Sequence, residues 1–240
     1  MSEKNEIEAA LLELVTANRI LAREGVLDAF GHVSVRHPTN PKHYFMARSR
    51  GPELVTLDDL MEFTLDNQPL DQRGRAMYAE RPIHGCIYQL RPEMNAVCHN
   101  HAHSLIPFGV TGTQLRPVFH MASVIGNSVP IWDIRKEFGD TNLLVTDQAQ
   151  GTSLARSLEQ GRVALMRGHG SVVAGRSLRE TVFTAVYLQV NADLLLKSHS
   201  LGEVTFLSPG EVDYASKLLF QSLSQDRAWE YWCRRAGSPS

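Results

Sequence analysis

Apolar residues recur every three or four positions near the start of the chain. Between residues 6 and 24 they are Ile7, Leu11, Leu12, Leu14, Val15, Ile20 and Leu21. This spacing predicts an amphipathic helix that ends at Gly25. A similar pattern predicts a long helix over residues 177–200, and residues 211–235 form a tail of helical composition with Trp229, Tyr231 and Trp232 near its end.

Between these predicted helices, the sequence contains alternating patterns and short apolar segments. Val33 and Val35 alternate with polar residues and predict a strand, followed by a turn from His37. The run 163–166 predicts a strand end, residues 80–90 and 147–158 predict helices, and the stretches from Phe108 and Ser123 predict short strands and loops. Since no repeat, linker or low-complexity stretch interrupts the pattern, we expect a single domain over residues 1–240.

Composition narrows the class of protein. With 240 residues, 43% of them hydrophobic, the chain can bury a core without disulfides. A net charge of −2 predicts neither a nucleic-acid partner nor an anionic membrane, and no stretch has transmembrane length. Cys86, Cys98 and Cys233 form no C-x-x-C pair, so we expect reduced thiols in a cytoplasmic protein, with Cys98 in the core.

Three histidines have the spacing of metal ligands. His99 and His101 lie two residues apart in A-V-C-H-N-H-A-H, and an extended segment would present both imidazoles on one face. His169 stands between two glycines after an apolar run, where a tight turn can bring it to a distant site. Three imidazoles suit zinc, manganese, iron or cobalt. In a chain with 10 histidines, the alternative is that the pair is structural or merely exposed.

An acidic residue spaced regularly from a histidine and a tyrosine favours the metal interpretation. Glu80 is followed by His84 at i+4 and Tyr88 at i+8, and on a helix these side chains share one face.

Three motifs together resemble the class II aldolase/adducin family. They are the run from Glu80 to His103, G-H-V-S-V-R at 31–36 and R-G-H-G at 167–170, and the resemblance extends over residues 7–212. It implies an α/β/α fold of three layers with a central, mostly antiparallel sheet. It also implies one divalent metal per chain, held by His99, His101 and His169, and places the family's catalytic glutamate, which can also bind the metal, at Glu80.

The chain departs from the sugar-phosphate aldolases of that family where those enzymes hold phosphate. His32 replaces an asparagine, and an arginine-containing loop replaces a neutral T-P-S-G loop. Guanidinium groups match carboxylates bidentately, which favours a carboxylate substrate, although arginines are more often surface residues. The candidate substrate-binding residues are His32, Arg48, Ser49, Arg50, Gly51 and Arg81, with Arg75 a weaker candidate.

This pattern resembles the decarboxylase branch of the family. The resemblance implies a metal-dependent, non-oxidative lyase acting on a hydroxylated aromatic or pyridine dicarboxylate such as 3,4-dihydroxyphthalate, through an enolate-like anion. Glu80 is the expected proton donor if burial raises its pKa, with His32, His120 and Tyr187 as second candidates. The family also implies a homo-oligomer, expected to be a tetramer.

Two other functions stay open at this point. The first is a class II aldolase or epimerase acting on a sugar phosphate. The second is an adducin-like scaffold without catalysis, and the presence of His99, His101 and His169 argues against it.

Overall fold

A seven-stranded sheet forms the centre of the molecule. The computed structural model describes residues 2–238. The strand order is β3-β2-β1-β4-β7-β6-β5, and all neighbours are antiparallel except β5 and β6. The strands are β1 His32–Arg36, β2 His43–Ala47, β3 Leu60–Thr64, β4 Ala96–Asn100, β5 Ile131–Trp132, β6 Val163–Met166 and β7 Gly170–Gly175.

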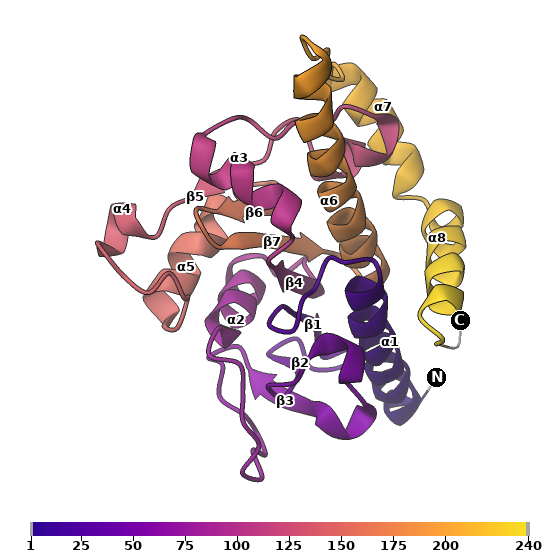
Figure 1. Ribbon diagram of the computed structural model, residues 1–240. Helices are drawn as coiled ribbons and strands as arrows, with labels where there is room; N and C mark the ends of the chain where they lie inside the picture. The colour runs from indigo at the N-terminus through magenta and orange to yellow at the C-terminus, as the bar shows by residue number, and fades with distance from the viewer. Residues whose placement is uncertain (1, 239–240) are drawn as a thin grey trace.

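Helices cover both faces of this sheet, as Figure 1 shows. One apolar core lies between the sheet and the long helices α1 and α6, with α8 packed on both, and a second core lies between the sheet and helices α2 and α5. The helices are α1 Glu3–Arg23, α2 Arg81–Leu90, α3 Ile106–Thr111, α4 Arg135–Phe138, α5 Gln148–Ser157, α6 Leu178–Leu201, α7 Pro209–Leu219 and α8 Ser222–Arg235, with short 3-10 turns η1 Pro52–Leu54, η2 Leu57–Asp59, η3 His103–Leu105 and η4 His120–Ile125. The expected three-layer α/β/α fold with a mostly antiparallel sheet is confirmed.

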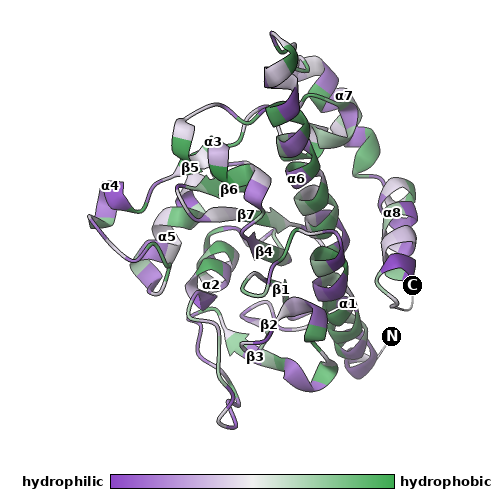
Figure 2. Cartoon of the chain, viewed as in Figure 1, coloured by the Kyte–Doolittle hydropathy of each residue, from purple (hydrophilic) through white to green (hydrophobic). Residues whose placement is uncertain are grey.

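Local sequence explains where the main helices begin. Ser2, Asp147 and Ser177 precede α1, α5 and α6, and each side chain accepts a hydrogen bond from the backbone N–H three residues later. In Figure 2, α1 and α6 carry hydrophobic and hydrophilic residues in alternating bands, as expected for helices with one buried side. In the part of the chain that the structure describes, no helix is long and apolar enough to span a bilayer.

Two glycines, one in α5 and one in α2 itself, allow helix α2 to pack closely against its neighbours. A Cβ atom built on Gly151 of α5 would lie 2.6 Å from both Cys86 Sγ and the Pro82 carbonyl oxygen. A Cβ built on Gly85 would lie 2.3 Å from Asn67 Oδ1. Both distances are shorter than van der Waals contact. At both positions α2 is packed so closely that there is no room for a methyl group.

Two sequence-based expectations were wrong in detail. The stretch at Phe108 lies in helix α3, which has a proline in its first turn and ends at Gly112 with a φ of 73°. Its β-branched residues had favoured strands, but this proline and glycine match a helix start and end. The stretch at Ser123 lies in the 3-10 turn η4 and precedes the short strand β5. The tail from residue 211 is helical as expected, although it divides into α7 and α8.

Candidate metal centre

Four candidate ligands meet at one end of the central strands. Glu80 is the residue just before α2, His99 lies on β4, His101 directly follows that strand, and His169 lies in the turn between β6 and β7. One ligand atom from each residue lies within 4.8 Å of the others. Strands β4 and β7 pair with each other, with His99 opposite Val172, which explains how residues seventy positions apart reach the same site.

The Nδ1 atoms of the three imidazoles all face oxygen atoms. His99 Nδ1 lies 3.1 Å from the Ser171 carbonyl oxygen, and His169 Nδ1 lies 3.0 Å from the Leu143 carbonyl oxygen. His101 Nδ1 lies 3.2 Å from Asp28 Oδ1. A carbonyl or carboxylate oxygen can only accept, so each Nδ1 carries the hydrogen and each Nε2 presents a lone pair.

The lone pairs converge on a common point. His99 Nε2 and His101 Nε2 are 3.1 Å apart, yet neither has a hydrogen to donate to the other in this tautomer. Glu80 Oε2 lies 3.5 Å from His99 Nε2 and 3.6 Å from His169 Nε2. A cation among these atoms removes the repulsion between unshared electron pairs, and held Nδ1–H groups are typical of metal-binding histidines. The residues present therefore fit one divalent metal ion.

Glu80 is held as an anion facing the histidines. Its Oε1 accepts a hydrogen bond of 2.9 Å from the Val145 backbone N–H, which leaves Oε2 directed at the ligands. Burial raises the pKa of Glu80, but the contacts with His169 and His99 outweigh that effect, and the pKa is lowered. The raised pKa required for Glu80 to be the resting proton donor is thus not found, and an ionised carboxylate suits a metal ligand or a proton acceptor.

His32 lies beside the metal ligands without being one of the four. It is the cross-strand partner of His99 on β1, and the two ring centroids are 5.1 Å apart. Its Nδ1 is 2.7 Å from His84 Nε2.

His84 does not join the ligands, although it shares the i, i+4 frame of Glu80. Its two ring nitrogens contact His32 and Ser34 on β1, and burial is the main cause that lowers the pKa of His84 to about 3. Glu80 therefore faces the three histidines, whereas His84 faces strand β1.

The arginine loop approaches the site through Tyr78. The Tyr78 hydroxyl donates to the Arg50 carbonyl oxygen and accepts from the Arg50 N–H at 3.3 Å, while its ring centroid lies 4.6 Å from that of His32. Arg48 Nε lies 2.7 Å from Asp59 Oδ1, and Arg50 Nε lies 3.4 Å from Asp59 Oδ2. Two guanidinium groups thus lie against one buried carboxylate.

The other predicted substrate-binding residues have varied surroundings. Arg81 donates to the carbonyl oxygens of Tyr78 and Asn67, which occupies much of its guanidinium. Arg75 donates to backbone carbonyls of the 58–72 segment and so acts as a local brace. Ser49 and Gly51 flank Arg50 in the loop, with the Ser49 N–H bonded to Ala76.

The other two predicted proton donors lie in a separate cavity. His120 and Tyr187 line a space of about 450 Å³ formed by η4, α6, α7 and α8, together with Tyr231 and Trp232. None of the four candidate ligands lines this cavity among the residues 2–238.

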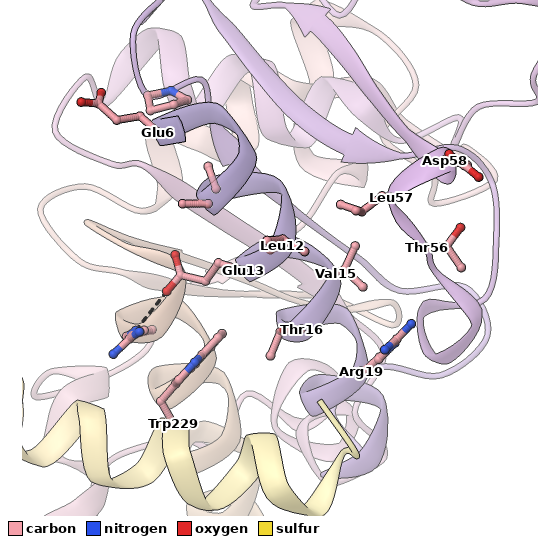
Figure 3. A pocket seen from close by; sticks show the side chains of 14 residues that line it. Glu6, Leu12, Glu13, Val15, Thr16, Arg19, Thr56, Leu57, Asp58 and Trp229 are labelled. Atoms are coloured by element: carbon pink, nitrogen blue, oxygen red, sulfur yellow. Dashed lines mark hydrogen bonds and ion pairs between the residues drawn. The ribbon is translucent and has the colours of Figure 1, made fainter. Parts of the chain in front are cut away.

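A spacious cavity lies away from the candidate metal centre. It measures about 950 Å³ and lies between α1, the 56–58 segment and α8, as seen in Figure 3. A smaller cavity of about 380 Å³ is lined by Asp28 and His101 together with residues of α6, and thus borders the metal centre.

Sequence reasoning missed the groups that orient the ligands. Asp28 holds His101, and the carbonyl oxygens of Leu143 and Ser171 hold His169 and His99. The one available signal was the acidic residue four positions before His32 in D-A-F-G-H.

Comparisons with known proteins agree with this geometry. Residues 12–196 match the Class II Aldolase and Adducin N-terminal domain. The chain belongs to the class II aldolase/adducin family. It is 35% identical to decarboxylase tropJ of Talaromyces stipitatus over 92% of this chain and 91% of that protein. It is 26% identical to a 3,4-dihydroxyphthalate decarboxylase of Arthrobacter keyseri, with 79% of this chain and 78% of that protein covered.

A solved structure shows the same fold. The L-fuculose 1-phosphate aldolase of Glaciozyma antarctica superimposes with a TM-score of 0.81 at 21% identity, covering 98% of this chain and 93% of that one. The curated relatives include both decarboxylases and aldolases, which indicates that this family member is a lyase. Members of the family use a divalent metal, and Glu80, His99, His101 and His169 form a cluster that can hold one.

Proposed function

We propose that this protein is a metal-dependent carboxy-lyase that removes CO2 from a hydroxylated aromatic or heteroaromatic dicarboxylate such as 3,4-dihydroxyphthalate. The observation that carries the proposal is the pair Arg48 and Arg50, which share the single carboxylate of Asp59 next to Tyr78 and His32. Two guanidinium groups in a loop that contacts Tyr78, whose ring packs on His32, suit a substrate with a carboxylate to anchor. The similarity to two decarboxylases supports the same reaction class.

Each part of the site has a role in this reaction. A divalent ion held by the three histidines and Glu80 would stabilise negative charge on the substrate hydroxyl oxygen as the carbon–carbon bond breaks. Arg50 would hold the carboxylate that is retained, so that the bond to the departing carboxylate stands out of the ring plane. Glu80 Oε2, free of backbone hydrogen bonds, is the carboxylate oxygen placed to accept and return a proton.

The alternative is a class II aldolase or epimerase acting on a sugar phosphate. The fold shared with L-fuculose 1-phosphate aldolase favours it. The loops at 31–34 and 49–52 would then bind phosphate, and Arg50 also suits that anion. The carboxylate substrate is favoured by the buried imidazole of His32 and by the Arg48–Arg50 pair. These residues stand where the sugar-phosphate aldolases have neutral hydroxyl and backbone donors for phosphate.

Product analysis separates the two reactions. We would incubate protein loaded with zinc, manganese, iron or cobalt with hydroxylated aromatic dicarboxylates and with sugar phosphates, and measure CO2 and aldehyde. In deuterated water a decarboxylated ring should carry one deuterium at the vacated carbon, and an analogue without the hydroxyl should bind without reacting. A His99→Ala/His101→Ala variant serves as the control. Aldehyde from a sugar phosphate, with no CO2 from any aromatic acid, would establish the alternative.

We further propose that the protein acts as a homo-oligomer, with a tetramer as the expected size. Exposed apolar side chains on α7 and α8 support this: Tyr214, Leu218, Leu223 and Tyr231 are 57–79% exposed. Light scattering after size exclusion should give a mass about four times that of the chain if the surface is an interface of a tetramer.

A further inference from the structure

A chain of buried hydrogen bonds leads from β1 and α2 to His32. Tyr88 OH lies 2.7 Å from Ser34 Oγ, Ser34 Oγ lies 2.6 Å from His84 Nδ1, and His84 Nε2 lies 2.7 Å from His32 Nδ1. All four residues are at most 2% exposed, so water does not compete for these bonds. The chain ends at the ring that lies beside the ligand His99.

The two histidines in this chain are neutral. Both rings are at most 2% exposed, and their hydrogen-bond contacts are Ser34 and each other rather than a carboxylate. Burial without a charged partner favours the uncharged imidazole. A neutral imidazole carries one hydrogen, so each ring must donate through one nitrogen and accept through the other. The hydrogens along the chain can therefore point in only two directions.

Tyr88 decides between these directions. The Val97 backbone N–H can only donate to the Tyr88 hydroxyl, so within residues 2–238 Ser34 Oγ is the acceptor for the Tyr88 hydrogen. If Ser34 donated to Tyr88, the buried Tyr88 hydrogen would have no acceptor, which is unfavourable. Tyr88 therefore donates to Ser34, and the single hydrogen of Ser34 is left to donate to His84.

The direction continues to the metal centre. His84 Nδ1 accepts from Ser34, so His84 carries its hydrogen on Nε2 and donates it to His32 Nδ1. His32 must then carry its own hydrogen on Nε2. That nitrogen makes no hydrogen bond to any residue in the described range 2–238, so its N–H is available to a ligand.

We infer that Ser34 and His84 fix His32 as a neutral Nε2–H hydrogen-bond donor to an anionic oxygen of the substrate. This role rests on the proposed function for the identity of the substrate, whereas the tautomer of His32 follows from the hydrogen-bond chain alone. A donor held in advance beside a centre where negative charge develops stabilises the transition state without reorganisation. Ser34 and His84 are positioning residues, because they act through His32.

Ser34→Ala and Tyr88→Phe form a matched pair for the test. Both remove one buried hydroxyl from the same chain. Without Ser34 Oγ, His84 Nδ1 has no partner and the preference for one tautomer is lost. Without the Tyr88 hydroxyl, Ser34 still donates to His84, because the opposite direction would leave the Ser34 hydrogen unsatisfied. Ser34→Thr keeps a hydroxyl and should restore the wild-type state.

The first measurement needs no substrate. In zinc-loaded protein with 15N-labelled histidine, long-range proton–nitrogen correlation spectra report which ring nitrogen is protonated, and a His32→Gln variant assigns the signals. We expect protonated Nε2 and unprotonated Nδ1 in the wild type, Tyr88→Phe and Ser34→Thr, and a mixture in Ser34→Ala. A wild-type His32 protonated on Nδ1, or an unchanged tautomer in Ser34→Ala, would overturn the inference whatever the substrate is.

The second measurement follows turnover of the substrate found in the product screen. Ser34→Ala should lower kcat at least roughly tenfold, and His32→Gln up to about 10²–10³-fold, as for loss of a donor to a developing anion. Metal content should stay unchanged, and Tyr88→Phe should remain within a few-fold of wild type. Equal loss in Ser34→Ala and Tyr88→Phe would indicate a merely structural role for the chain.

Discussion

Asp28 Oδ1 lies 3.2 Å from His101 Nδ1 and also accepts the backbone N–H groups of Phe30 and Gly31 at 2.9 Å each. Burial raises the pKa of Asp28, but these amides and His101 outweigh it and the pKa is lowered, so the carboxylate is ionised at neutral pH. One oxygen thus links the orientation of a metal ligand to the loop that leads into His32.

Asp28→Ala should weaken metal binding about 10–100-fold, the usual cost of losing a group that orients a ligand histidine. Competition with a chelator measures this affinity. Asp28→Asn, which keeps an acceptor oxygen, should lose less. Asp58→Ala removes an exposed acid and is the matched control. Wild-type affinity in Asp28→Ala would show that His101 is oriented by other contacts.

Glu80→Gln should retain the fold and about one metal per chain, because three imidazoles remain and the new side chain can still accept from Val145. Activity should fall by about 10²–10⁴-fold, the range for loss of general acid–base catalysis. Elemental analysis and steady-state rates on the same preparation test both parts. Full activity in Glu80→Gln would remove Glu80 from proton transfer.

Arg50→Ala should lower kcat/KM by about 30-fold or more, which corresponds to about 2 kcal/mol for a lost charge-assisted contact. Arg50→Lys should be intermediate, since an ammonium cannot make the bidentate contact. Arg73→Ala, at an arginine side chain 75% exposed, controls for the change in net charge. Equal kcat/KM in all three variants would show that Arg50 is a surface residue that does not bind the substrate.

The free energy of unfolding should fall as pH drops below about 6.5. The pKa of His84 is 6.5 in the unfolded chain and about 3 in the fold, so between these values the unfolded state binds one more proton. The slope contributed by this residue is about 1.4 kcal/mol per pH unit, lost as pH falls and regained as it rises. Denaturant titrations in the presence of a chelator measure it.

The variant His84→Gln should flatten this pH dependence, and His199→Gln, at an exposed histidine, should leave it unchanged. An unaltered slope in His84→Gln would assign the acid sensitivity to other buried groups.

The clustering of the candidate ligands could be anticipated from the sequence because their spacing reflects strand geometry. His99 and His101 are two residues apart around a strand end, and His169 follows a strand at a glycine turn, so local structure alone aims them at one site. The groups that orient these histidines could not be predicted from the sequence. Two are backbone carbonyls, which every residue has, so no side-chain pattern marks Leu143 or Ser171.

The frame of Glu80, His84 and Tyr88 shows a second limit. The spacing predicts one shared face, and His84 and Tyr88 do both reach Ser34. Glu80, however, precedes the first turn of α2, with a φ of −88° and a ψ of 23°, and its side chain turns to the metal ligands instead. A shift of one position at a helix start changes the direction of a side chain, and spacing does not reveal it.

The arginines could be counted in the sequence but not paired. Arg48 and Arg50 share Asp59, whereas Arg75 and Arg81 bind backbone carbonyls. Their pairing depends on the path of the loop between residues 48 and 81.

The glycine at position 151 gives the metal centre a dependence on a helix that supplies none of its ligands. A methyl group there would press on Pro82 and Cys86, and α2 has no free space to move away, because Gly85 is already against Asn67. Glu80 stands at the head of that helix, two residues before Pro82. Because α2 cannot retreat, Gly151→Ala would crowd the start of the helix that follows Glu80, so a residue that supplies no ligand limits where Glu80 can lie.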